Sequence, residues 1–124
     1  MSALAPILAV DDSAPIREMI VAVLAPRGHR VATAANGREA LDRLNAAVEP
    51  YIVLLDLVMP ILDGIRVCQE IERDERLRSA GHRVVLMSNT LRLAGPDVPV
   101  TTGQLVKPFS RQQLIAAVHA ARGE

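Results

Sequence analysis

The chain has 124 residues, half of them hydrophobic, and its 14 basic and 14 acidic side chains leave a formal net charge of zero. This composition predicts one folded domain, residues 1–124, and the balanced charge argues against nucleic-acid binding through a broad basic surface. No apolar stretch is long enough to span a membrane, and the lone cysteine, Cys68, excludes an internal disulfide, so we expect a cytoplasmic protein without a signal peptide.

The first half of the chain alternates apolar runs of strand length with segments of helical periodicity. In chain order we expect a strand at residues 6–11, a helix from Ser13 to Pro26, a strand at 29–34, a helix from Asn36 to Pro50 and a strand at 51–55. Ser13 is a favourable N-cap, and Pro15 suits the first turn of the helix that follows. The apolar stripe of the second helix is expected to include Val48.

The second half continues the alternation but is less regular. Here we expect a helix from Asp63-Gly64 with a charged end at 73–76, a strand at 84–87, a strand at 105–106 and a helix capped by Ser110. Gly95, Pro96 and Pro99 interrupt the segment between the last two strands, so the sequence predicts at most a short helix near residues 90–94.

Five strands alternating with helices predict an α/β fold with a doubly wound parallel sheet. Crossovers between parallel strands are right-handed, so the carboxyl ends of all the strands lie at one edge of the sheet. Ligands bind at that edge in open α/β sheets. The residues that follow each strand are therefore the first candidates for a functional site.

Polar and charged residues stand at four of these strand ends. Asp11 and Asp12 follow the first strand, Asp56 the third and Ser88 the fourth, while Lys107, the only lysine in the chain, follows the fifth. Carboxylates about 4 Å apart repel by about 4 kcal/mol at an effective dielectric near 20, so such a cluster requires a cation or a bound proton. Oxygen ligands at an open, hydrated site favour Mg²⁺ over Zn²⁺.

The combination of groups indicates phosphoryl chemistry. A hydroxyl and an ammonium beside a carboxylate and a metal ion can hold the oxygens of a phosphoryl group in transit, and a carboxylate acceptor would become an acyl phosphate. Each residue also has a simpler interpretation. Asp11, Asp12 and Asp56 could be turn or capping carboxylates, Lys107 could extend its head into water, and the three histidines could be solvated.

At these residues the chain resembles the response-regulator receiver family, the chemotaxis-type phosphoacceptor domains. The matching motifs span nearly the whole chain: residues 7–13, 36–41, 54–60, 63–64, 86–88 and 107–109. The resemblance implies a flavodoxin-like (βα)5 fold with strand order 2-1-3-4-5 and, given the interrupted segment, a shortened or irregular fourth helix.

The resemblance also implies a role for each acidic residue. Asp56 would take a phosphoryl group from a sensor histidine kinase or a phosphotransfer protein and would signal to a downstream protein. Asp12, Asp56 and the backbone carbonyl of Val58 would ligate Mg²⁺ directly, and Asp11 would reach the ion mainly through water.

Two further residues would act on the phosphoryl group itself. Ser88 would bond a phosphoryl oxygen, and Lys107 would pair first with Asp56 and then with the phosphate. The Lys107-Pro108 bond is expected to be cis.

Three departures from the family pattern bear on the switch. Gln104 stands where the family usually has an aromatic residue, Asn89 stands where a small residue is common, and the segment 89–103 is short and interrupted. We expect a stand-alone receiver that catalyses only its own phosphorylation and dephosphorylation. The alternatives are a constitutive docking module without a working switch and, less favoured, a Mg²⁺-dependent phosphohydrolase. The latter lacks an acid or base two positions after Asp56, where Val58 stands.

Overall fold

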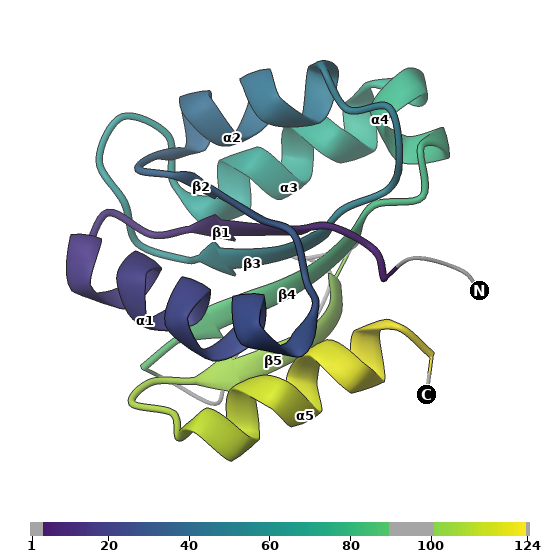
Figure 1. Cartoon of the computed structure of the whole chain (residues 1–124). Coiled ribbons are helices and arrows are strands. Elements are labelled where there is room, and N and C mark those ends of the chain that lie inside the picture. The colour runs from purple at the N-terminus through teal and green to yellow at the C-terminus, as the bar shows by residue number, and fades with distance from the viewer. Residues whose placement is uncertain (1–3, 90–100, 124) are drawn as a thin grey trace.

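The structure, a computed structural model, describes residues 4–89 and 101–123. Its centre is one sheet of five parallel strands in the order β2-β1-β3-β4-β5 (Figure 1). The strands are β1 (Ile7–Val10), β2 (Val31–Ala34), β3 (Ile52–Asp56), β4 (Arg83–Ser88) and β5 (Thr101–Val106). The predicted α/β fold and strand order are confirmed.

Helices cover both faces of this sheet. They are α1 (Ala14–Leu24), the 3-10 turn η1 (Ala25–Arg27), α2 (Gly37–Asn45), α3 (Gly64–Arg73), α4 (Glu75–Ser79) and α5 (Arg111–Ala121). Figure 1 shows α1 and α5 on one face and α2, α3 and α4 on the other. The strands are all parallel, so their carboxyl ends lie at one edge of the sheet, called here the carboxyl edge.

The central strands are mostly apolar because helices pack on both of their faces. All of β1 and β3 is buried. Side chains alternate along each strand, so Leu8 and Leu55 join the core under α2 and α3, whereas Ile7 and Leu54 join the core under α1 and α5. Two cores thus hold the strands in register, and that register sets the positions of the residues just beyond them.

Helix starts follow the capping residues in the sequence. The side chains of Ser13, Asn36, Asp63 and Ser110 each accept a hydrogen bond from a backbone N–H three residues later, and Ser110 forms a full capping box with Gln113. These caps fix where each loop of the carboxyl edge ends and its helix begins.

Three local expectations were wrong. The charged end of α3 does not continue that helix: Asp74 adopts extended backbone and caps the separate helix α4. Val48 lies outside α2, which ends at Asn45, and it is 97% exposed. His29 is buried rather than solvated, and His82 is partly buried, with its Nδ1 accepting the Tyr51 N–H. The irregular fourth helix expected near residues 90–94 lies outside the described residues.

Within residues 4–89 and 101–123, no helix has the length and apolar character needed to cross a membrane.

Candidate functional site

Strand register brings the predicted site residues to the carboxyl edge. Val10 pairs with Leu55, so Asp11 and Asp56 occupy neighbouring ends of β1 and β3. On the other side of β3, Ser88 is the last residue of β4 and pairs with Val106, which precedes Lys107. The backbone N–H of Lys107 donates to the Ser88 carbonyl oxygen at 2.6 Å. Groups distant in sequence are therefore adjacent because parallel strands end together.

The three aspartates form a single cluster. Asp11, Asp12 and Asp56 each offer one carboxylate oxygen, and these oxygens all lie within 4.8 Å of one another. Asp11 is buried, Asp56 is 6% exposed and Asp12 is exposed. The cluster thus has a buried side and an open side, with Asp12 facing solvent.

Lys107 provides the balancing ammonium. Its Nζ donates to Asp11 Oδ2 at 2.7 Å and to Asp56 Oδ1 at 3.2 Å. One lysine therefore bridges two of the three carboxylates. The Lys107-Pro108 peptide bond that follows is cis, as expected.

Every oxygen of Asp11 has a donor. Oδ1 accepts from the Ser13 N–H at 2.9 Å, Oδ2 accepts from Lys107, and the backbone carbonyl oxygen accepts from Arg17 Nη1 at 2.7 Å. Both carboxylate oxygens are thus engaged with the protein. This arrangement agrees with the prediction that Asp11 reaches a metal ion mainly through water, which itself stays a prediction.

The electrostatics of Asp56 and Lys107 reflect this crowding. Burial and the charge of Asp11 raise the pKa of Asp56, and the nearby Lys107 only partly opposes them. Burial acts to lower the pKa of Lys107, but the hydrogen bond and charge of Asp11, followed by those of Asp56, outweigh it and raise that pKa. These effects favour the charged ammonium form of Lys107 and disfavour the charged carboxylate form of Asp56.

The donor set fits a small divalent cation. All three side chains offer oxygen, the ligand that Mg²⁺ prefers, and one of them is open to water. One oxygen from each carboxylate lies within 4.8 Å of the others, so a single small cation could contact more than one of them.

An opening of about 210 Å³ leads to Asp56. It is lined by Asp56, Leu57, Val58, Ser88, Asn89 and Lys107. The buried Ser88 and Lys107 thus border the same space as Asp56. Asn89 lines the same space, and a narrowing of the access to Asp56 by its side chain stays a prediction. Val58 lies at the rim with its side chain 75% exposed, and the direction of its carbonyl toward the cluster stays a prediction.

Two glycines at helix starts allow close approach of the loop between β3 and α3. The Gly64 N–H donates to the Leu57 carbonyl at 2.9 Å, and the Gly37 N–H donates to the Leu62 carbonyl at 3.1 Å. A Cβ at Gly64 would lie 2.5 Å from the Asp56 carbonyl oxygen, and one at Gly37 would lie 2.2 Å from the Leu62 carbonyl oxygen. The loop approaches both helix starts so closely that only glycine fits.

Two features of the site were not found in the sequence. One is the bond from Arg17 to the Asp11 carbonyl, and the other is the shorter contact of Lys107 with Asp11 than with Asp56. The helical spacing placed Arg17 one turn after Ser13, but no pattern in the sequence indicates that a long side chain turns back toward the preceding strand end.

The chain is similar in sequence to known signalling proteins. Residues 7–119 match the family described as the response regulator receiver domain. The chain is 38% identical over 120 residues to the response regulator MprA of Mycolicibacterium vanbaalenii, covering 92% of this chain and 48% of that protein. It spans about half the length of the curated relatives that it matches.

Solved structures have the same fold. The chemotaxis response regulator CheY4 of Vibrio cholerae superposes with a TM-score of 0.81 at 30% identity, covering 95% of this chain and 98% of that one. The response regulator TrrA of Thermotoga maritima, in complex with Mg²⁺-BeF, superposes with a TM-score of 0.80 at 28% identity, covering 94% of this chain and 98% of that one.

Proposed function

The chain belongs to the response regulator receiver family of two-component signalling, and from this premise we propose that it accepts a phosphoryl group on Asp56 with the help of Mg²⁺. The observation that carries the proposal is the convergence of three carboxylates and the Lys107 ammonium at the carboxyl edge. Members of this family are phosphoacceptors rather than enzymes that turn over an external substrate.

We propose that Asp12, Asp56 and the Val58 carbonyl hold the metal ion, with Asp11 acting through water. The ion, when bound, would neutralise carboxylate charge and the charge of phosphoryl oxygens. The structure of the relative TrrA was determined in complex with Mg²⁺-BeF, which supports Mg²⁺ as the ion that this chain would bind. The engagement of both Asp11 oxygens with protein donors supports the indirect role of Asp11.

The chemistry that the residues would perform follows from their positions. A carboxylate oxygen of Asp56 would form a bond to phosphorus while the bond from phosphorus to the donor imidazole nitrogen breaks, and that nitrogen would keep the electron pair. Ser88 and Lys107 border the same opening, so the hydroxyl and the ammonium would bond the phosphoryl oxygens. Lys107 would exchange part of its contact with Asp56 for the phosphate.

The partners are proposed from the family. Receiver domains accept phosphoryl groups from histidine kinases, so we propose a sensor histidine kinase or a phosphotransfer protein as the donor and an unidentified protein as the downstream partner. We further propose that residues 1–124 form one receiver unit. The output of any longer protein and the cytoplasmic location stay predictions.

Gln104 supports a second candidate function, a constitutive docking module without a working switch. In such a module, phosphorylation would change the structure little. It is exposed on β5, where the family usually carries an aromatic residue that follows the movement of the hydroxyl residue. Titration with Mg²⁺ and a beryllofluoride mimic of the phosphate, followed by backbone amide shifts, separates the two candidates. Shifts that extend beyond the pocket to residues 101–105 of β5 favour the switch, whereas shifts confined to the pocket residues, Lys107 among them, favour the docking module.

The phosphoacceptor proposal is tested by labelling the purified chain with a small acyl phosphate. We expect the intact mass to rise by one phosphoryl group in the presence of Mg²⁺, and Asp56→Asn to abolish the gain. Asp63→Asn is a matched control, because Asp63 caps α3 outside the cluster and asparagine caps equally well. No mass gain in the wild type, under conditions that label another receiver, would contradict the proposal.

A further inference from the structure

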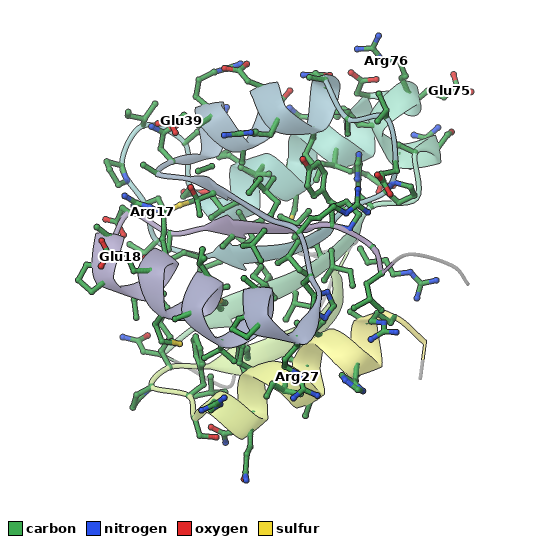
Figure 2. All side chains as sticks on the ribbon, in the orientation of Figure 1. Arg17, Glu18, Arg27, Glu39, Glu75 and Arg76 are labelled. Carbon is green, nitrogen blue, oxygen red and sulfur yellow. The ribbon has the colours of Figure 1, made fainter. Side chains whose placement is uncertain are left out.

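We propose that Arg17 is a positioning residue that sets the geometry of Asp12 for metal binding by holding the Asp11 carbonyl. The inference rests on the proposed magnesium site and adds a residue from α1 to it. Arg17 lies one turn into α1, and its Nη1 donates to the Asp11 carbonyl oxygen at 2.7 Å. Figure 2 shows Arg17 at the end of α1 near the end of β1, whereas Arg27 lies at the opposite end of that helical segment.

The carboxylate of Asp12 differs from those of Asp11 and Asp56 in its hydrogen bonding. In the described part of the chain, no side-chain or backbone donor hydrogen-bonds to its carboxylate, and the residue is exposed. Asp11 and Asp56, by contrast, share Lys107, and Asp11 also accepts from Ser13. The position of the Asp12 carboxylate therefore depends on the backbone that carries it.

Arg17 holds that backbone directly. The Asp11 carbonyl and the Asp12 amide belong to one planar peptide unit, so a hydrogen bond that fixes the carbonyl oxygen also fixes the orientation of the plane from which Asp12 extends. The other contacts of this turn act on Asp11 instead: its N–H donates to the Ala34 carbonyl at 3.2 Å, and its Oδ1 accepts from Ser13. Among the described residues, Arg17 makes the one side-chain hydrogen bond to this peptide unit.

The direction of the change in Mg²⁺ affinity distinguishes a positioning role of Arg17 from an effect of its charge. A guanidinium beside the cluster repels a cation, so removing its charge alone would strengthen Mg²⁺ binding. Removing the hydrogen bond frees the peptide plane and weakens Mg²⁺ binding, because Asp12 must then be ordered when the ion binds. A weaker affinity on loss of Arg17 is thus the opposite of what simple electrostatics requires.

The test is a Mg²⁺ titration of Arg17→Met, which keeps an apolar stem and removes the donor. We expect the dissociation constant, followed by backbone amide shifts, to rise about tenfold, at the low end of the effect of groups that orient metal ligands. At saturating Mg²⁺, labelling by a small acyl phosphate should stay within about twofold of the wild type, because Asp56, Ser88 and Lys107 are unchanged.

Arg38→Met is the matched control. Arg38 is exposed in the first turn of α2, which also begins at the carboxyl edge, and it makes no hydrogen bond or ion pair in the described structure. This variant removes a positive charge without removing a hydrogen bond, so its Mg²⁺ affinity should equal or slightly exceed that of the wild type. If Arg17→Met binds Mg²⁺ as tightly as the wild type or more tightly, the inference is overturned.

A second measurement needs no variant. In the wild type, the Nη protons of Arg17 should stay protected from exchange with water both without and with Mg²⁺, because the bond to Asp11 persists when the ion binds. Loss of that protection on metal binding would overturn the inference even if Arg17→Met were too unstable to titrate. Failure of the wild type itself to bind Mg²⁺ would instead contradict the proposed metal site, and this inference with it.

Discussion

The ammonium nitrogen of Lys107 lies 2.7 Å from Asp11 Oδ2, closer than the 3.2 Å that separates it from Asp56 Oδ1. The pairing with Asp56 expected from the sequence is therefore shared with a residue that would touch the metal only through water. Asp11 is fully buried, so it depends on this lysine for charge balance, whereas Asp56 borders the opening through which a donor would approach. The lysine thus stabilises the site before it meets any phosphate.

Lys107→Met should lower the free energy of unfolding by about 1–3 kcal/mol, because the Asp11 carboxylate would remain buried with one donor fewer. The exposed pair of Arg30 and Glu49 provides a control, and Arg30→Met should lower the free energy of unfolding less than Lys107→Met does. Urea unfolding at neutral pH measures both losses. Equal losses would show that burial of the site pair has no energetic consequence.

Gly64→Ala should destabilise the fold by about 1–3 kcal/mol and slow labelling of Asp56, because the new Cβ would lie 2.5 Å from the Asp56 carbonyl oxygen. The backbone that carries the phosphoacceptor would have to move. Gly103→Ala on β5 is the control, since a Cβ there meets no atom within 4 Å. If both alanine variants unfold at the wild-type urea midpoint, the close approach of the Asp56 carbonyl oxygen to Gly64 is contradicted.

Ile61→Gly should raise the free energy of unfolding by about 0.5–1 kcal/mol. Ile61 has a φ of 72°, and the Leu62 N–H donates to the Pro60 carbonyl across it at 2.8 Å, so a β-branched residue occupies the strained centre of a γ-turn. Its side chain is 79% exposed, so little apolar burial is lost with it.

Val58→Gly in the same loop should lower the free energy of unfolding, the opposite of Ile61→Gly, and it serves as the control. Val58 is also largely exposed but has no left-handed backbone to relieve, so glycine there should only add freedom to the unfolded chain. Thermal melts rank the two variants against the wild type. A destabilised Ile61→Gly would contradict the strain at this turn.

His82 should contribute to acid destabilisation. Its Nδ1 accepts the Tyr51 N–H at 3.0 Å, and burial lowers the pKa of His82 below the ordinary 6.5. Between that ordinary pKa and the lowered one, the unfolded chain binds more protons than the folded chain, so stability falls as pH falls below about 6.5. Burial lowers the pKa of His29 in the same sense.

His82→Asn should therefore reduce the stability lost on acidification, because an amide oxygen can accept the Tyr51 N–H without taking up a proton. Urea midpoints at pH about 7.5 and about 5 give the comparison. An equal loss in the variant and the wild type would assign the acid sensitivity to other groups, among them His29.

The sequence predicted the site because parallel topology converts order along the chain into neighbours in space. Asp11, Asp56, Ser88 and Lys107 each stand where an apolar run ends, and right-handed crossovers leave those ends at one edge. The buried strands were recognisable from their apolar composition alone.

Features that depend on long side chains or on marginal helix ends were not predictable in this way. The return of Arg17 to the Asp11 carbonyl is a choice of rotamer, which spacing does not encode. Pro50 sets only the latest possible end of α2, so Val48 was wrongly assigned to its apolar stripe. Asp74 lies within a charged stretch, which gave no sign that one helix ends and another begins there. It caps α4 because its backbone is extended, and amino-acid composition does not predict that conformation.

The most direct test of the central claim is to locate the phosphoryl group within the chain. After labelling with a small acyl phosphate, borohydride reduction traps the acyl phosphate and tandem mass spectrometry identifies the modified residue. We expect the modification at Asp56 in Mg²⁺ and none when EDTA removes the ion. Modification of Asp11 or Asp12 instead, or labelling that EDTA leaves unchanged, would contradict a magnesium-dependent phosphoacceptor at the end of β3.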